Sequence, residues 1–520
     1  MNREIILGGP GAGKTTELVN RYRDALIDGV HPNDILLITY TRKARHEIRR
    51  RIAEEFGLEY SDLDMIRTFH SFLWTYVLRW SMALSLKKEH LEDFGRQNGY
   101  TFRFWDKDVN AMSVDTLGGT LYYLQYLMRV FNLTEKETWD RFMYPRLCPV
   151  RPVAIKTFSE QYTAYKETMG LKDYQDCIEN VITSGRSLGS FHTIMIDEAQ
   201  DLTGTLWQLL PKIEESAQNV IFAGDDDQSI YTFGGADVKS FLTLTDAGYT
   251  KTVLPRSHRM PRAIYDFSQA LIRLLGDRRY TKEFAPKEEG GKIGIVSSLD
   301  SIDLEDSQRT FLLLAPTNYL AQQTYIEYLQ QRGLPYITKG DSFNEAKDVQ
   351  AIAAYEALQE GKNIDGKSAG VLYSLLPSSC IAHGFKKTQF DHKGHYDKDS
   401  LTRDFGYRVT NQRWEDVLMI KSTRINYLLK VGKSYSWYVK PWIEVATIHA
   451  AKGGEADVVT LMCDISSSQG RIHKQDKDVL RRLFYVAATR AKSELWMLSR
   501  RTSRFYDEYL TLTKEFRNAY

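Results

Sequence analysis

Short runs of consecutive apolar residues, without alternation, indicate where this chain forms buried strands. Ile5 to Leu7, Ile194 to Ile196, Val220 to Ala223 and Phe311 to Ala315 are runs of this kind. Continuous apolar runs are typical of strands that are buried on both faces of a parallel sheet. We therefore expect an α/β fold in which parallel sheets are flanked by helices.

Apolar residues at helical spacing mark two further regions. Ala44, Ile48, Ile52 and Phe56 form a stripe that predicts a helix packed on a sheet. Residues 76–185 are rich in Tyr, Trp and Leu at mostly helical spacing and lack phosphate-binding motifs. This interval is therefore predicted to be a helical insertion.

Length and composition set limits on the domain number and on the partners. At 520 residues, the chain exceeds what one hydrophobic core supports, so several domains are expected. The 69 Lys and Arg residues nearly balance 67 Asp and Glu residues, so overall charge indicates no anionic partner. The first strand leaves no room for a signal peptide, and no apolar run reaches the roughly 20 residues of a membrane span. Four scattered cysteines look like reduced thiols, so we expect a cytoplasmic protein without a membrane partner. The cytoplasm of a prokaryotic or phage-type host is the location that we expect.

The run GGPGAGKTT directly follows the first apolar run and matches the pattern G-x-x-x-x-G-K-[ST]. Its glycines let backbone N–H groups surround a polyphosphate, at the positive N-terminus of the next helix. Lys14 is expected to reach the terminal phosphates, and the Thr15 hydroxyl to bind Mg²⁺. A plain glycine-rich turn is the alternative, which the strand and helix context disfavours. The predicted nucleotide-binding residues here are Gly8, Gly9, Pro10, Gly11, Ala12, Gly13, Lys14, Thr15 and Thr16.

Two adjacent carboxylates, Asp197 and Glu198, end the second apolar run. Ligands bind at the carboxyl ends of strands in open parallel sheets. Asp197 is expected to help hold Mg²⁺, and Glu198 to orient and deprotonate the attacking water. Most Asp-Glu pairs are merely solvated, but this pair lies downstream of a P-loop and so predicts hydrolysis of a nucleoside triphosphate.

Six further segments occur in an order that resembles the UvrD/Rep group of superfamily 1 DNA helicases. The segments are Thr39 to Arg51, Ile66 to Phe72, Ala223 to Tyr231, Leu254 to Arg259, Thr447 to Glu455 and Arg481 to Lys492. The resemblance implies two RecA-like motor domains, each with a mainly helical insertion. It also implies an ATP- and Mg²⁺-dependent translocase and helicase that moves 3′ to 5′ on single-stranded DNA and acts at junctions with duplex DNA. A protein loader or a repair or replication factor would be a further partner.

Several residues in these segments are predicted to act on the nucleotide. Gln228 follows an apolar run and is expected to sense the terminal phosphate. Arg259 and Arg490 are the arginines expected to stabilise charge on the transferred phosphoryl group. The alternative for either arginine is a surface salt bridge. By resemblance, Glu455 would bind the ribose, and His258 stands where a stacking tyrosine is common.

The order of these residues along the chain predicts where the nucleotide lies. Lys14 and Asp197 belong to the first half, whereas Arg490 lies near the C-terminus. We therefore expect the nucleotide between two sheet domains, so that hydrolysis opens and closes a cleft.

Aromatic and basic residues in the same segments are candidates for DNA contacts. They are Tyr40, Arg42, Phe69, His70, Tyr231, Phe233 and His449. Stacking of bases on aromatic rings tolerates any sequence and is worth roughly 1 to 3 kcal/mol per base, which suits a translocating motor. Phe233 is the best stacking candidate. The basic face after Thr41 is, by itself, more typical of a solvated surface.

Some positions depart from the family pattern. Only seven residues precede Gly8, so the upstream glutamine segment that reads adenine is not found there, and Thr16 replaces a frequent arginine. Gly234 and Gly454 replace residues that commonly contact DNA. Adenine preference and two DNA contacts are therefore less secure than hydrolysis.

The gaps between motifs predict the domain boundaries. The first motor domain would comprise residues 1–75 and 186–277 with the insertion 76–185, and the second would comprise 278–358 and 441–520 with the insertion 359–440. The second insertion is short for the family. Its Cys380, His383, His392 and His395 have a spacing that permits zinc binding, but a polar loop is the more common reason for such a pattern.

Two other functions remain open from the sequence. One is a nucleotide-gated DNA clamp or partner subunit that hydrolyses ATP without unwinding, and the other is a motor that moves on RNA. The sequence does not specify the biological pathway, the oligomeric state or, beyond resemblance, the direction of movement.

Overall fold

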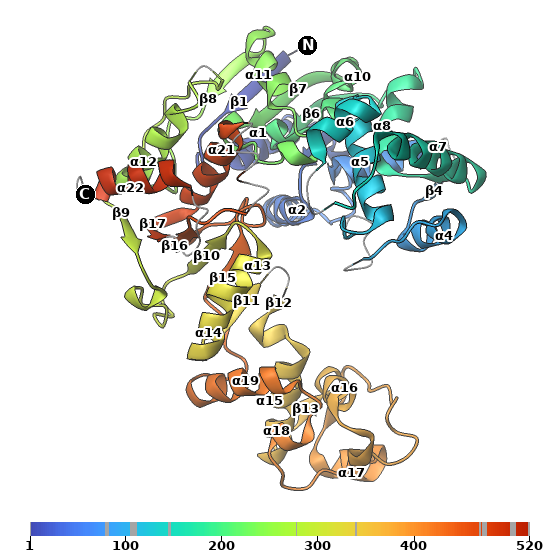
Figure 1. Ribbon diagram of the computed structural model, residues 1–520, viewed down its shortest axis with the longest axis vertical. Coiled ribbons are helices and arrows are strands. Elements are labelled where there is room, and N and C mark those ends of the chain that lie inside the picture. Colours follow the sequence, from blue (N-terminus) through green and yellow to red (C-terminus); the bar gives the residue numbers. More distant parts are fainter. Residues whose placement is uncertain are drawn as a thin grey trace. The chain divides into compact units, whose positions relative to one another are not determined.

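The computed structural model divides the chain into two compact units, each built around one sheet (Figure 1). The first unit contains Met1–Met260, Ile272–Glu288 and Arg471–Val486, and the second contains Pro261–Leu271, Glu289–Gly470 and Ala487–Tyr520. The residues that the structure describes are 2–78, 83–104, 112–143, 147–276, 278–338, 341–466, 470, 476–499 and 506–517.

A six-stranded sheet forms the centre of the first unit, and its neighbouring strands are all parallel. The strands are β1 (Asn2–Leu7), β2 (Ile35–Thr39), β3 (Ile66–Thr68), β6 (Phe191–Ile196), β7 (Ala217–Gly224) and β8 (Thr250–Val253), in the order β3-β2-β6-β7-β1-β8. The parallel sheet predicted from the apolar runs is confirmed. Because parallel strands end at the same edge, the residues that follow β1, β2, β6 and β7 meet there.

Helices cover both faces of this sheet. They include α1 (Lys14–Ile27), α2 (Arg42–Phe56), α3 (Phe69–Leu78), α9 (Gly204–Trp207), α10 (Leu210–Glu215) and α11 (Val238–Asp246). Successive residues of β1 point to opposite faces. Ile6 shares a core with Ile48 and Ile52 of α2, whereas Ile5 shares the other core with Phe241 of α11. The apolar stripe predicted on α2 is therefore confirmed as a packing face.

The first insertion is mostly helical and has a core of its own. Its elements are β4 (Leu84–Ser85), α4 (Lys88–Asn98), α5 (Leu117–Phe131), α6 (Glu135–Phe142), α7 (Pro152–Thr168), β5 (Leu171–Lys172) and α8 (Tyr174–Thr183). Phe94 of α4, Leu124 of α5 and Phe158 of α7 belong to this core. The aromatic and leucine residues that marked the interval in the sequence thus pack helices against one another.

A seven-stranded sheet forms the centre of the second unit, in the order β12-β11-β15-β10-β16-β17-β9. The strands are β9 (Lys292–Val296), β10 (Phe311–Ala315), β11 (Tyr336–Thr338), β12 (Asp341–Ser342), β15 (Ile443–Thr447), β16 (Ala456–Met462) and β17 (Ala491–Leu498). All neighbours are parallel except β11 and β12, which are antiparallel. The predicted strand Phe311 to Ala315 is fully buried in it.

Further helices lie wholly or partly in the second unit. They include α12 (Arg262–Arg273), α13 (Asn318–Ala321), α14 (Glu327–Arg332), α21 (Lys477–Ala488) and α22 (Asp507–Arg517), of which α12 and α21 each run from one unit into the other. A small helical part is inserted before β15. It consists of α15 (Lys347–Gln359), β13 (Ile364–Asp365), α16 (Gly366–Leu375), β14 (His395–Tyr396), α17 (Lys398–Phe405), α18 (Trp414–Val417) and α19 (Ser422–Ser434).

The two units divide the chain differently from the boundaries expected from motif spacing. Residues 272–288 and 471–486 lie in the first unit, although most of them were expected in the second motor domain. A bidentate ion pair between Arg278 and Asp478 joins these two segments, and one of its N–O distances is 3.0 Å. Contacts between residues 200 positions apart leave no local pattern in the sequence. The motor-domain boundaries stay a prediction.

Two negative findings concern the part of the chain that the structure describes. Cys380, His383, His392 and His395 do not gather into a group that could hold a metal ion. The zinc site that their spacing permits is therefore not formed, and all four cysteines of the chain are free. Within the same residues, no helix has the length and the apolar character needed to cross a membrane.

Candidate active site

The loop between β1 and α1 has the conformation that its glycines allow. Gly11 and Gly13 have φ angles of 71° and 88°, which other residues rarely adopt. A side chain at Gly11 would also collide with Arg259, because a Cβ atom there would lie 2.5 Å from the Arg259 Cβ. Helix α1 begins at Lys14, immediately after Gly13. The loop and the helix N-terminus therefore form the phosphate cradle that the sequence predicts.

Lys14 and Thr15 are placed by different contacts at the start of α1. The Lys14 ammonium donates to the carbonyl oxygen of Gly8 at 2.9 Å and lies within the loop. The Thr15 hydroxyl donates to the Asp197 carboxylate at 2.6 Å, across 182 residues of sequence. The two predicted metal ligands are therefore neighbours at the edge of the first sheet.

The backbone at the end of β6 directs Asp197 and Glu198 differently. Glu198 has φ of 54°, a left-handed conformation that is uncommon outside glycine and that turns the chain sharply after the strand. Its N–H donates to the Asp197 carboxylate at 2.9 Å. Burial and the neighbouring Glu198 charge raise the pKa of Asp197 above its usual range. Both effects disfavour the ionised Asp197 carboxylate, and a cation bound to it would offset both.

Gln200 joins this pair to the loop that carries Gln228. Its amide nitrogen donates to the Glu198 carboxylate at 2.5 Å, and its amide oxygen accepts the N–H of Asp225 at 2.9 Å. The Gln228 amide in turn donates to the Asp225 carboxylate at 2.7 Å. Sequence reasoning missed Gln200, although it stands two residues after Glu198 in the same run.

The segment around Arg259 packs directly on the phosphate loop. The Ser257 hydroxyl donates to the carbonyl of Pro10, and the N–H of His258 donates to the carbonyl of Gly11, both at 2.8 Å. The first unit thus brings together the predicted residues of the loop, both carboxylates, Gln228, His258 and Arg259.

The remaining predicted nucleotide residues lie in the second unit. Arg490 is 2% exposed and donates to the carbonyl of Gly454 at 3.4 Å and to the hydroxyl of Thr489 at 3.2 Å. Glu455 pairs with Lys492 at 2.9 Å. The predicted DNA contact His449 lies in the turn that follows β15.

Three candidate stacking rings lie together in the first unit. Tyr40 follows β2 and stacks on Tyr231 with ring centroids 5.4 Å apart, and Phe233 lies 6.2 Å from Tyr231. Tyr40 and Phe233 are 45% and 47% exposed, which is unusual for large apolar rings. Phe69, by contrast, is 7% exposed in the sheet core, so its ring has little surface to offer a base.

Aromatic residues of the first insertion extend this group, and sequence reasoning missed them. The Tyr126 hydroxyl donates to the carbonyl of Gly234 at 3.4 Å, and Tyr174 stacks on His70. With Tyr122 and others, they line a hollow of about 250 Å³. The only signal in the sequence was the high tyrosine content of the interval.

Two basic residues of α2, Arg49 and Arg50, form ion pairs within the protein. Arg50 pairs with Glu47 and Glu54, each at 2.8 Å, and Arg49 pairs with Asp64 at 3.1 Å. Arg42, at the first position of α2, is exposed. The solvated-surface interpretation therefore fits Arg49 and Arg50, whereas Arg42 lies close in sequence to Tyr40.

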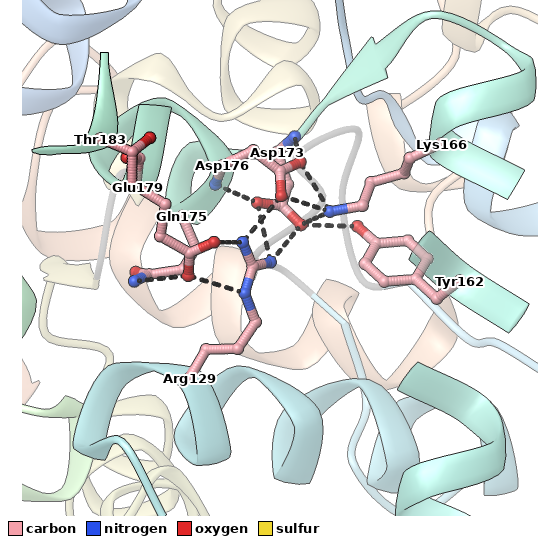
Figure 2. Close-up of polar contacts among 8 residues, drawn as sticks. All are labelled: Arg129, Tyr162, Lys166, Asp173, Gln175, Asp176, Glu179 and Thr183. Atoms are coloured by element: carbon pink, nitrogen blue, oxygen red, sulfur yellow. Dashed lines mark hydrogen bonds and ion pairs between the residues drawn. The ribbon is translucent and has the colours of Figure 1, made fainter. Parts of the chain in front are cut away.

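A network of charges holds the segment that carries Tyr174 (Figure 2). Arg129 of α5 pairs with Asp173 at 3.1 Å and with Asp176 and Glu179 at 2.7 Å. Lys166 of α7 pairs with Asp173 and Asp176 at 2.6 Å. Burial opposes ionisation, yet Arg129 and Lys166 lower the pKa of Asp173 to about 2. The network ties the start of α8 to two helices of the insertion.

Replacement of Arg129 by Met should destabilise the first unit by about 3 to 5 kcal/mol, because buried carboxylates would lose their cation. A lowered pKa of Asp173 contributes stability that is present above about pH 5 and is lost as the pH falls towards 2. The free energy of unfolding, measured with urea, should therefore be much lower in the variant than in the wild-type protein at pH 7, and the difference should be smaller at pH 3.

The matched control is Arg96→Met in the same insertion, because the Arg96 side chain is 70% exposed in its pair with Asp93. It should change stability by less than about 1 kcal/mol. Equal deficits of Arg129→Met at both pH values would contradict the role given to Asp173.

Comparison with known proteins finds helicase domains in both halves of the chain. Residues 2–247 match the UvrD/REP helicase N-terminal domain, and residues 416–502 match the UvrD-like helicase C-terminal domain. The chain is 26% identical to the ATP-dependent DNA helicase Rep of Buchnera aphidicola, over 68% of this chain and 55% of the relative. It is 25% identical to the ATP-dependent DNA helicase PcrA of Leuconostoc citreum, over 68% and 50%. It is 22% identical to DNA helicase II of Escherichia coli, over 96% and 83%. The chain thus spans about half the length of Rep and PcrA.

Proposed function

The chain belongs to the UvrD/Rep helicase family, and from this we propose that it hydrolyses ATP to move along single-stranded DNA and unwind duplexes. Its two parallel sheets with flanking helices are the RecA-like motor domains of this family. We assign the first sheet to the first motor domain and the second sheet to the second. Movement from 3′ to 5′, a loader or repair partner and a cytoplasmic location are further predictions.

The observation that carries the proposal is the hydrogen bond between Thr15 and Asp197, beside Lys14. It supports a phosphate site in which a P-loop hydroxyl and a strand-end carboxylate act on one ligand. Their oxygen atoms are the ligand type that Mg²⁺ prefers, so these two residues would hold it. When bound, Mg²⁺ neutralises charge on the phosphates.

The other residues of the first unit have roles that follow from their contacts. Lys14 would exchange its bond to the Gly8 carbonyl for contacts with the terminal phosphates. Glu198, oriented by Gln200, would take the proton of the attacking water as the water oxygen bonds to the γ-phosphorus. The bond from this phosphorus to the β–γ bridging oxygen breaks in the same step, and ADP leaves with that oxygen. Gln228 and Arg259 would contact the same phosphoryl group. Arg490 is predicted from its motif to complete the site.

The rings of Tyr40, Tyr231 and Phe233, of which Tyr40 and Phe233 are exposed, support a path for single-stranded DNA. Flat aromatic surfaces bind any base, which a motor that moves along DNA requires. They follow β2 and β7, at the same sheet edge as the phosphate site. Movement of the phosphate-site loops would thus be transmitted over a short distance to the rings.

A clamp that hydrolyses ATP without unwinding is the alternative. The features that favour it are the small second insertion and Gly234, which replaces an arginine often found after the stacking aromatic residue in this family. The similarity to Rep, PcrA and DNA helicase II favours the helicase.

Strand displacement on tailed duplexes tests the proposed function. With ATP and Mg²⁺, we expect displacement from a duplex with a 3′ single-stranded tail and little from one with a 5′ tail. ATP hydrolysis without displacement on either substrate would support the clamp. Stronger stimulation of hydrolysis by RNA than by DNA would overturn the choice of DNA.

Phe233→Ala should lower DNA-stimulated turnover more than basal turnover, because one stacking contact worth roughly 1 to 3 kcal/mol is lost. The concentration of oligonucleotide that gives half-maximal stimulation should rise by about 5- to 150-fold. Tyr60→Ala is the matched control, since Tyr60 is also 47% exposed in the first unit but precedes β3. Equal effects of the two substitutions would argue against stacking on Phe233.

A further inference from the structure

A buried lysine outside the motif segments named above lies among three aspartates next to the phosphate site. The Lys282 side chain is 0% exposed, and its ammonium lies 3.0 Å from Asp225, 3.1 Å from Asp227 and closer still to Asp226. The three aspartates are also fully buried. Carboxylates in such a place require a cation.

A second cation, Arg279, pairs with one of these aspartates. Arg279 donates two hydrogen bonds to Asp227, at 2.8 and 2.6 Å. The N–H of Tyr280 donates to Asp226 at 2.9 Å. Lys282 is thus left as the cation that lies between Asp225 and Asp226.

Asp225 connects Lys282 to the predicted phosphate sensor. One carboxylate oxygen of Asp225 contacts the ammonium, and the other accepts the amide of Gln228 at 2.7 Å. The N–H of Asp225 donates to Gln200, which also contacts Glu198. The lysine is therefore separated from Gln228 by a single carboxylate.

The chain segment that carries Lys282 also contacts the phosphate loop. A Cβ atom at Gly9 would lie 2.2 Å from the Phe284 ring, so this ring packs directly on the loop. Ala285 exchanges backbone hydrogen bonds of 2.8 Å with Pro255 and Ser257, just before Arg259. Residues 279–285 thus contact three segments of the site in the first unit: the phosphate loop, the loop of Gln228 and the residues just before Arg259.

We propose that Lys282 is a positioning residue for ATP hydrolysis, whose ammonium fixes Asp225 and thereby holds Gln228 towards the terminal phosphate. The inference rests on the proposed hydrolysis of ATP. Without the ammonium, the buried Asp225 carboxylate must find another partner, and the Gln228 amide loses its fixed acceptor. The phosphate loop and Lys14 keep their contacts, so turnover falls while ATP binding changes little.

A double-mutant cycle tests this inference. Lys282→Met and Gln228→Ala are made singly and together, and kcat and KM for ATP are measured with saturating single-stranded DNA. We expect Lys282→Met to lower kcat by about 10-fold, a typical scale for coupled contacting residues, with KM changed by less than about 3-fold. In the Gln228→Ala background, Lys282→Met should have almost no further effect.

Two further variants separate positioning from stability. Lys282→Met/Asp226→Asn removes one charge of each sign, so it should fold even where the single variant does not, yet kcat should remain low. Lys166→Met is the matched control, because Lys166 is a buried lysine paired with two aspartates in the first insertion. Lys166→Met should have a small effect on basal kcat, and this effect should add to that of Gln228→Ala.

Additive losses in the cycle, recovery of wild-type kcat in Lys282→Met/Asp226→Asn, or a rise in KM alone would overturn the inference. A wild-type protein without ATP hydrolysis would instead overturn the proposed function. The two failures are therefore distinguishable.

Discussion

The contact between Thr15 and Asp197 is the constraint on which the candidate site depends. It joins the start of α1 to the end of β6, two elements that belong to distant parts of the sequence. It forms because β1 and β6 both lie next to β7 in a parallel sheet, so that their carboxyl ends reach the same edge. The phosphate loop, the acidic pair and the loop of Gln228 are all placed by this strand order.

Charge compensation in buried surroundings is the second requirement, and it recurs in separate parts of the first unit. Asp225 and its neighbours are paired with Lys282 and Arg279, and the acidic residues at the start of α8 are paired with Arg129 and Lys166. Asp197 differs, because no side-chain cation pairs with it at comparable distance among the described residues. Its raised pKa follows from burial first and from Glu198 second. The carboxylate that lacks a paired cation is thus the one predicted to bind the metal ion.

The sequence predicted the parts of the fold and site that have local patterns. Continuous apolar runs identified the strands, and the residues after them, Lys14, Thr15, Asp197 and Glu198, follow from strand order. Lys282 and Arg129 were missed because their partners lie 44 positions away or more, outside any periodic pattern. Phe69 was predicted to contact DNA because it lies in the segment Ile66 to Phe72, but its ring is buried in the core of the first sheet. The cysteine and histidines of the second insertion have a spacing along the chain that permits zinc binding. Spacing in the sequence alone does not determine whether the side chains meet in the fold.

Steady-state ATP hydrolysis by Thr15→Ser and Thr15→Val tests the central claim most directly. Serine keeps the hydroxyl that contacts Asp197 and would bind Mg²⁺, whereas valine keeps the shape and removes the oxygen. With single-stranded DNA and excess Mg²⁺, Thr15→Ser should retain most of the wild-type turnover, and Thr15→Val should lose at least about 10-fold. Wild-type turnover in Thr15→Val would contradict the account, because the contact that assembles the site would then contribute nothing to its chemistry.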